Sequence, residues 1–307
     1  MRYTRIRTLV QWTLITSILA FWAYAVWSQW DAIAGYPWQV GWAELLGAQF
    51  LLLAQMFLLA VGWWRILVLM GGHLPWQVGA SMWLRAQLAR YLPGGVWDIA
   101  GRAALSRDTG IPLRMVPAGA TLEIALQIYS ATLFLLGTLV LFPTPRLRPY
   151  LPFLLLGMFL MTVALTPPLF TRGLHTAFRL LKRPPLPIRL TLADVLTLLG
   201  LYMTAHLMQG LGFVLFTHGL TRLRWQDTPL LVGSYVGAWL VGYLAIFAPT
   251  GIGVREGALV LLLGKRLPFA LITGAALGYR VWLSLRDVLA ALIGLGLNHT
   301  WNRSDSL

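Results

Sequence analysis

Residues 90–107 read RYLPGGVWDIAGRAALSR, and they interrupt what is otherwise helical sequence. Pro93 lacks the amide hydrogen that a helix needs, and Gly94 and Gly95 lose more backbone entropy than other residues when they become helical. The sequence on each side favours a helix, over Val78–Leu92 before the break and over Trp97–Leu105 after it. The stretch therefore predicts a short helix, a break and a second short helix.

The sequence around this break is apolar enough to lie in a membrane. Of the 307 residues in the whole chain, 58% are hydrophobic and 11% are charged. In a soluble domain about one quarter of the residues are charged. Several windows reach the roughly 20 apolar residues that cross a bilayer as a helix, and they are much longer than the strands of a membrane barrel. We therefore predict an all-α polytopic membrane bundle that forms one integral membrane domain over residues 1–307.

The apolar pattern predicts about six full spans and two broken helical hairpins. The first hairpin, Val78–Leu105, is too short to cross twice, so we interpret it as re-entrant, with both ends on one side of the membrane. The alternative is an amphipathic helix that lies on the membrane surface. The second hairpin consists of Leu230–Phe247 and Leu259–Leu263, separated by residues 248–257, APTGIGVREG. The six spans are Leu9–Trp30, Leu45–Leu69, Met115–Phe142, Tyr150–Leu169, Asp194–Leu220 and Pro268–Leu297.

The charge distribution predicts the orientation. The chain has 24 basic and 10 acidic residues, a net charge of +14, and in a membrane protein such an excess favours anionic lipid rather than nucleic acid as the partner. The basic N-terminus, with Arg2, Arg5 and Arg7, and the basic connection Thr171–Leu190 both follow the rule for cytoplasmic segments. We predict that both termini are cytoplasmic in a bacterial inner membrane. The absence of cysteine excludes disulfides, thiolate metal sites and cysteine nucleophiles.

The two breaks suggest an internal repeat. Pro93 and Pro249 are each followed by two nearby glycines, a pair of charged residues and an apolar run, and each break has two spans before it and one after it. The halves would be residues 1–143 and 150–297, and an odd number of spans in each would invert the second half. Inverted repeats with broken helices are typical of transporters, which bind their substrates near the bilayer midplane. The alternative is chance similarity, because glycine and proline are common in spans.

The residues at the breaks are the candidates for binding a lipid head group. Asp98 and Arg102 lie one helical turn apart and can pair on one face. A helix that begins just after Gly94 and Gly95 presents free amides and its positive dipole end to the break, which favours an anion. The alternative is that Asp98 and Arg102 form only a structural pair that locks the hairpin. With the equivalent residues of the second break, the candidates are Arg90, Gly94, Gly95, Asp98, Arg102, Gly251, Gly253, Arg255 and Glu256.

Other polar residues lie within the predicted spans, where charge is costly and commonly functional. Glu123 requires a partner, and we expect Arg280 or Arg286, because the spans that carry them correspond in the proposed repeat. The alternative is a buried ion pair that only fixes helix register. We expect a structural hydrogen bond for His206 and a local pair between Asp287 and Arg286.

The sequence contains no pattern that indicates catalysis. It has no evident nucleophile with its base, no phosphate-binding glycine loop that ends in Lys-Ser or Lys-Thr, and no cluster of metal ligands. We therefore expect no enzyme activity, no metal and no cofactor.

The motifs YLPGGVW at 91–97, AGR at 100–102 and PTGIGVREG at 249–257 resemble those of a known family. This is the flippase-like membrane family named after the transmembrane domain of lysylphosphatidylglycerol synthase, and the resemblance covers essentially the whole chain. It implies a helical bundle with re-entrant segments that moves aminoacylated phospholipids or glycosylated polyprenyl phosphates. The soluble aminoacyl-transfer domain of the synthase is not among these residues, so the resemblance implies no lysine transfer. Family members often have histidine where this chain has Asp98, so the resemblance gives that residue no role.

Three functions remain open at this point. The favoured one is translocation or binding of an anionic phospholipid or a polyprenyl-phosphate-linked glycolipid. The second is a non-transporting membrane partner of a glycosyltransferase or another lipid-modifying enzyme, for which Thr171–Leu190 would supply the cytoplasmic surface. The third is a membrane-embedded lipid transferase.

Overall fold

A computed structural model describes residues 30–91, 96–245, 251 and 253–304, together with Tyr24 and Trp27. This part of the chain is helical and contains no strand, which confirms the all-α prediction. The predicted first span lies outside it except for Tyr24, Trp27 and Trp30, and so do the two glycines Gly94 and Gly95.

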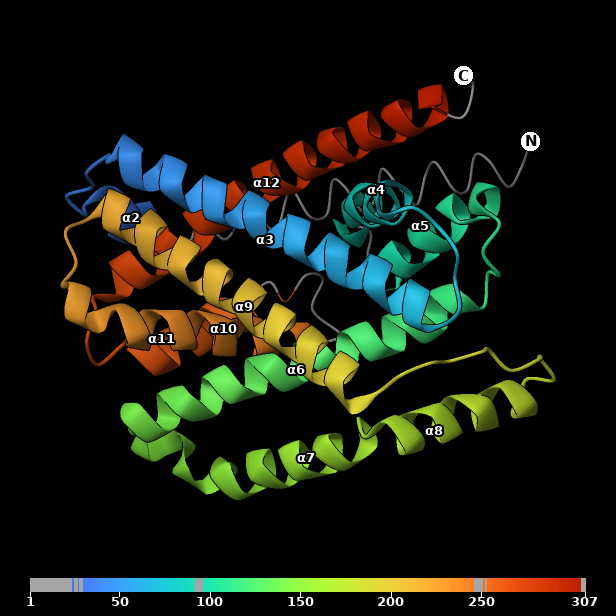
Figure 1. The fold of residues 1–307 in the computed structure, drawn as a ribbon. Helices are drawn as coiled ribbons and strands as arrows, with labels where there is room; N and C mark the ends of the chain where they lie inside the picture. The colour runs from blue at the N-terminus through green and yellow to red at the C-terminus, as the bar shows by residue number, and fades with distance from the viewer. Residues whose placement is uncertain are drawn as a thin grey trace.

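The helices follow one another with short 3-10 turns, labelled η, between some of them (Figure 1). In chain order they are α2 (Trp30–Ala34), α3 (Trp42–Leu69), α4 (Trp76–Ala86), η1 (Gln87–Tyr91), α5 (Trp97–Leu105), η2 (Arg107–Thr109), α6 (Met115–Leu141), η3 (Pro145–Tyr150), α7 (Leu151–Ala164), α8 (Pro167–Leu180), α9 (Leu192–Leu220), η4 (Trp225–Asp227), α10 (Thr228–Leu244), α11 (Val254–Leu263) and α12 (Phe269–Ser304).

Helices α3 and α9 form an antiparallel pair through the bundle (Figure 1). Backbone hydrogen bonds join them at both ends: the Gly41 amide donates to the Gly219 carbonyl at 2.7 Å, and the Arg189 amide, just before α9, donates to the Leu69 carbonyl at 2.8 Å. With 28 residues, α3 is about 42 Å long, which exceeds the hydrocarbon thickness of about 30 Å. This pair is long enough to serve as a frame for the shorter helices.

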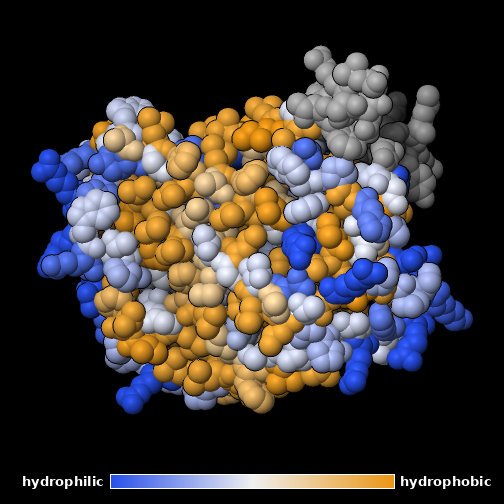
Figure 2. Space-filling model, viewed as in Figure 1, coloured by the Kyte–Doolittle hydropathy of each residue, from blue (hydrophilic) through white to orange (hydrophobic). Residues whose placement is uncertain are grey.

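Four helical stretches are long and apolar enough to cross a membrane: Trp42–Leu69, Met115–Leu141, Leu147–Ala164 and Leu192–Leu220. They match four of the six predicted spans, and their length and composition are consistent with a membrane protein. Figure 2 shows hydrophobic residues over the middle of one face and hydrophilic residues toward its two ends. Such a distribution fits a bundle whose middle lies in lipid.

Helices α7 and α8 lie along one edge of the bundle (Figure 1). None of the α7 side chains is buried, and Phe153, Leu155 and Phe159 are strongly exposed. An apolar surface of this kind is stable against lipid rather than against water. The placement of α7 therefore agrees with its assignment as a membrane span.

The basic connection predicted over Thr171–Leu190 is helical in its first half, which corrects the prediction of a loop. Thr166 has extended backbone, and Pro167 and Pro168 occupy the first turn of α8. Proline is favoured there because its missing amide hydrogen would have no partner inside the helix. At the other end of the chain, α12 continues to Ser304, past the predicted boundary at Leu297.

The structure describes the helices on both sides of the first predicted break, α4 before it and α5 after it. Helix α5 spans Trp97–Leu105, as predicted, and most of α4 is buried against α3 and α12. Gly101 of α5 lies so close to α4 that a β-carbon there would be 3.4 Å from the Ala86 β-carbon. The two short helices therefore fold back on each other.

Candidate functional site

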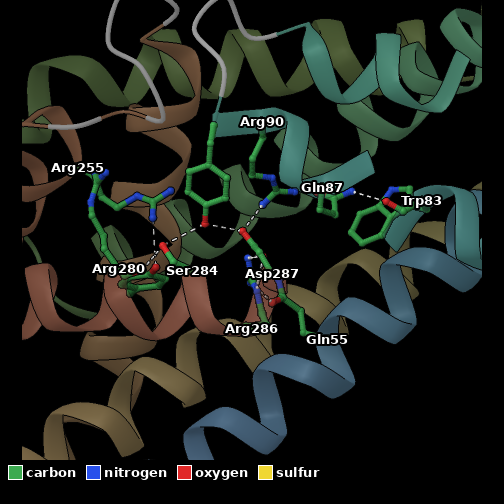
Figure 3. A network of polar contacts seen from close by, with 11 residues as sticks. Gln55, Trp83, Gln87, Arg90, Arg255, Arg280, Ser284, Arg286 and Asp287 are labelled. Carbon is green, nitrogen blue, oxygen red and sulfur yellow. Dashed lines mark hydrogen bonds and ion pairs between the residues drawn. The ribbon is translucent and has the colours of Figure 1, made fainter. Parts of the chain in front are cut away.

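The last described residues before the first break are attached to α12. The Tyr91 hydroxyl lies 2.9 Å from Asp287 Oδ2 and 3.1 Å from Ser284 Oγ, as a donor to both. A guanidinium nitrogen of Arg90 is 3.9 Å from the same Asp287 oxygen. Figure 3 shows Arg90 above α12 and Asp287 pointing up toward it. The end of η1 is thereby held on α12.

The second break is attached to the same helix. Arg280 Nε donates to Glu256 Oε1 at 2.6 Å, and its NH2 group donates to the Gly251 carbonyl at 3.0 Å. The second oxygen of Glu256 accepts from the Gly253 amide at 2.7 Å and so caps α11. Gly251 has φ of +68°, and a β-carbon there would lie 2.6 Å from the Gly242 carbonyl oxygen. Only glycine fits at this position, because α10 passes too close for a side chain.

The two attachment points share one face of α12. Arg280 and Asp287 are seven residues apart, which is two turns, or about 10 Å along the helix axis. Ser284 lies between them and donates to the Arg280 carbonyl at 3.0 Å. The described residues next to the two breaks therefore both contact α12, two helical turns apart.

A third group of charges surrounds Arg102 on α5. Arg102 donates to Asp98 Oδ2 at 3.0 Å, which confirms the predicted pair one turn apart, and it also donates to Glu123 Oε2 on α6. Arg102 and Glu123 are each 2% exposed. The guanidinium lies 4.3 Å from the ring centre of Trp63, and Trp83 Nε1 donates to Glu123 Oε1 at 2.7 Å.

The prediction that Glu123 pairs with Arg280 or Arg286 is wrong. Its partner is Arg102, because α5 packs directly on α6 and carries that guanidinium to the carboxylate. Arg280 is paired with Glu256. The two arginines of α12 are therefore held by carboxylates nearer to them than Glu123.

Arg286 makes the local pair that the sequence predicted. Its Nε and NH2 groups donate to Asp287 Oδ1 at 2.9 and 2.6 Å, and its NH1 group donates to Gln55 on α3 at 2.9 Å. Arg286 is 3% exposed. These contacts tie α12 to α3 inside the bundle.

His206 has the structural contacts expected of a buried histidine. Its Nδ1 lies 2.8 Å from Ser130 Oγ and 3.1 Å from the Tyr202 carbonyl, and its ring packs edge-on against Trp239. These contacts join α9 to α6 and α10. None of them involves a charged group at the breaks.

Two arginines at the breaks have no short ion pair within the described residues. Arg90 makes only the 3.9 Å contact with Asp287, and its side chain is 36% exposed. Arg255 donates to the neutral Tyr235 hydroxyl at 3.3 Å and lies 5.8 Å from that ring. Figure 3 shows Arg90 and Arg255 on the same side of α12. Arg102, in contrast, is enclosed by two carboxylates and an indole.

The charged groups that meet around the breaks carry a net positive charge. Each carboxylate is within ion-pair distance of at least one guanidinium. Five guanidinium groups face four carboxylates, so one positive charge is in excess. The cations are Arg90, Arg102, Arg255, Arg280 and Arg286, and the anions are Asp98, Glu123, Glu256 and Asp287.

Sequence reasoning missed the hydroxyl groups of this site. Tyr91 belongs to the first motif but carries no charge, and Ser284 is a common residue in spans. A signal was present: Arg280, Ser284 and Asp287 recur every three to four residues along an apolar helix, which places them on one face. Polar periodicity in α12 would have identified Ser284.

No family model matches this chain, and no curated protein is significantly similar to it. No group of three or more potential metal ligands occurs in the part of the chain that the structure describes. The family resemblance of the two motifs thus remains a prediction, and a functional proposal depends on the geometry of the site.

Proposed function

We propose that this protein binds an anionic lipid at the two breaks and moves it across the membrane. The observation that carries the proposal is that described residues beside both breaks contact one face of α12, through Asp287 for the first and Arg280 for the second. A ligand held there would contact residues from both halves of the chain. Such a site can change its access when the two halves move relative to each other.

The chemistry of the site favours a phosphate group. A guanidinium offers paired donors that match two oxygens of a phosphate. Arg90 and Arg255 have such donors available, since their contacts are a long ion pair and a neutral hydroxyl. The excess positive charge would be neutralised by one anionic head group.

The proposal includes a re-entrant path for both broken hairpins. The enclosure of α4 between α3 and α12 supports a hairpin inside the bundle rather than a helix on the membrane surface. Helices α5 and α11 begin at Trp97 and Val254, directly after the breaks, so their N-terminal dipole ends favour an anion there. The inverted repeat would pair α4 and α5 with α10 and α11.

The topology can be tested with single cysteines, because the native chain has none. The segment around Pro185 is exposed and follows three exposed basic residues, Arg179, Lys182 and Arg183, so we expect it to be cytoplasmic. Pro185→Cys should resist an impermeant thiol reagent in intact cells and react after permeabilisation. Arg148→Cys, also exposed but at the opposite end of the bundle, should react in intact cells. Labelling of Pro185→Cys in intact cells would contradict this topology.

Transport can be tested in liposomes that contain fluorescent phosphatidylglycerol. The purified chain should move the label between leaflets, and the combined Arg90→Gln and Arg255→Gln variant should be much slower. Arg179→Gln is the matched control, since it removes an exposed arginine from α8 rather than from a break. If the label moved equally fast in liposomes with the wild-type chain and in liposomes without protein, translocation would be contradicted.

One surface favours a second function, as a partner of a lipid-modifying enzyme. Leu180 and Leu181, at the end of α8, are 80% and 69% exposed and adjoin Arg179, Lys182 and Arg183. Exposed leucines beside basic residues are suited to contact with an acidic amphipathic surface. A partner role predicts that an enzyme co-purifies with the wild-type chain and is lost with Leu180→Gln.

A further inference from the structure

The two oxygens of Asp287 have different partners. Oδ1 accepts two hydrogen bonds from Arg286, and Arg286 is held in turn by Gln55. Oδ2 points the other way, toward the Arg90 guanidinium at 3.9 Å (Figure 3). It also accepts from the Tyr91 hydroxyl at 2.9 Å. The charge of Asp287 is therefore compensated by Arg286 whether or not Arg90 is near.

Arg90 and Tyr91 can bind another acceptor in place of Asp287 Oδ2. The distance from Arg90 to Oδ2 exceeds that of a hydrogen bond, and the Arg90 side chain is 36% exposed. Tyr91 has a single proton, which lies near two acceptors, Oδ2 and Ser284 Oγ. If Oδ2 withdrew, the ion pair of Asp287 with Arg286 would persist, and no buried charge would lose its partner.

We propose that Arg90 and Tyr91 form an oxyanion subsite and that Asp287 Oδ2 is its internal occupant, which a phosphate oxygen of the head group displaces. This inference rests on the proposed lipid function. It adds the two donors that bind the phosphate beside the first break, and the carboxylate that competes with the phosphate for them. A phosphate oxygen is, like a carboxylate oxygen, a negatively charged acceptor, so it fits the same two donors. Without ligand, the contact holds the end of η1 on α12. Binding of a ligand releases it.

The test is to weaken the internal competitor. Asp287→Asn keeps the size of the side chain but removes its charge, so an anion should compete more successfully for Arg90. Affinity for phosphatidylglycerol in mixed detergent micelles, relative to diacylglycerol, which has no phosphate, should rise about fivefold. Asp194→Asn is the matched control, because it removes the carboxylate of an exposed ion pair with Arg65, away from α12, and should leave the affinity unchanged.

A second variant keeps the test decisive if Asp287→Asn fails to fold. Tyr91→Phe leaves the pair between Asp287 and Arg286 intact and removes one donor of the subsite, so phosphatidylglycerol binding should weaken about fivefold. A purely structural tyrosine would instead lower thermal stability without lipid and leave the affinity unchanged.

The outcomes separate this inference from the function on which it rests. Failure of the wild-type chain to prefer phosphatidylglycerol to diacylglycerol would overturn both. A preference in the wild type, with no gain in folded Asp287→Asn or no loss in Tyr91→Phe, would overturn the internal competitor alone.

Discussion

Replacement of Glu123 by alanine is expected to lower the free energy of unfolding by about 3–5 kcal/mol. The carboxylate is buried and accepts from Arg102, Trp83 and Gln127. Its loss leaves the buried Arg102 guanidinium with Asp98 alone and leaves the Trp83 donor without its acceptor. Glu123→Gln should lose less stability, since the amide oxygen can still accept from Trp83, but it should lose lipid movement. Equilibrium unfolding in mixed micelles measures the first effect, and the liposome assay measures the second.

The matched control is the ion pair between Arg65 and Asp194, whose arginine side chain is about half exposed. Arg65→Ala should cost less than about 1 kcal/mol, because water replaces the guanidinium and the hydrogen bonds from Thr191 to Asp194 remain. The double variant Glu123→Leu with Arg102→Met should recover much of the lost stability, since it removes both buried charges together. Equal effects of Glu123→Ala and Arg65→Ala would show that the buried pair is not the stabilising contact we infer.

Removal of either Arg90 or Arg255 is expected to weaken binding of the anionic lipid by about 10- to 150-fold. This is the cost of about 1.5–3 kcal/mol for one charge-assisted contact. The Arg→Lys variants should recover only part of the affinity, because an ammonium cannot reproduce the paired donors. In a double-mutant cycle the two losses should be strongly non-additive, since either removal spoils one shared site.

The sequence also predicted Arg102 as a candidate for binding the head group at the first break. In the structure Asp98 and Glu123 hold Arg102 in place. Arg102→Gln should therefore lower the free energy of unfolding without lipid by more than it lowers the free energy of lipid binding. Arg179→Gln, an exposed arginine on α8, is the control for net charge. Additive binding losses for Arg90 and Arg255, matched by equal drops in stability without lipid, would contradict a shared site.

Local sequence chemistry predicted the helices near the first break well. Proline and glycine fixed the start of α5, and the apolar run of α6 begins at Met115, as expected. The pair of Asp98 with Arg102 followed from helical geometry alone. Such features depend only on residues within one turn of each other.

Contacts between helices could not be predicted in this way. The partner of Glu123 depends on which helix packs on α6, and a single sequence carries no information on that neighbour. Helix α8 was missed for a different reason: Arg172 and Arg179 indicated a polar loop, while Pro167 and Pro168, which favour a helix start, were assigned to the preceding span. Charge and proline each have two structural meanings, and position along the helix decides between them.

The exposed helix α7 has a consequence for how this protein can diverge. It is joined to α6 by a hydrogen bond between Thr162 and Tyr129, and none of its side chains is buried. A substitution of one apolar residue for another on its exposed side, where Phe153, Leu155 and Phe159 lie, disturbs no packing inside the bundle, and a change in its length alters chiefly its fit to the bilayer. Among natural variants of this chain, α7 should be the span whose sequence drifts fastest and whose length follows the thickness of the host membrane.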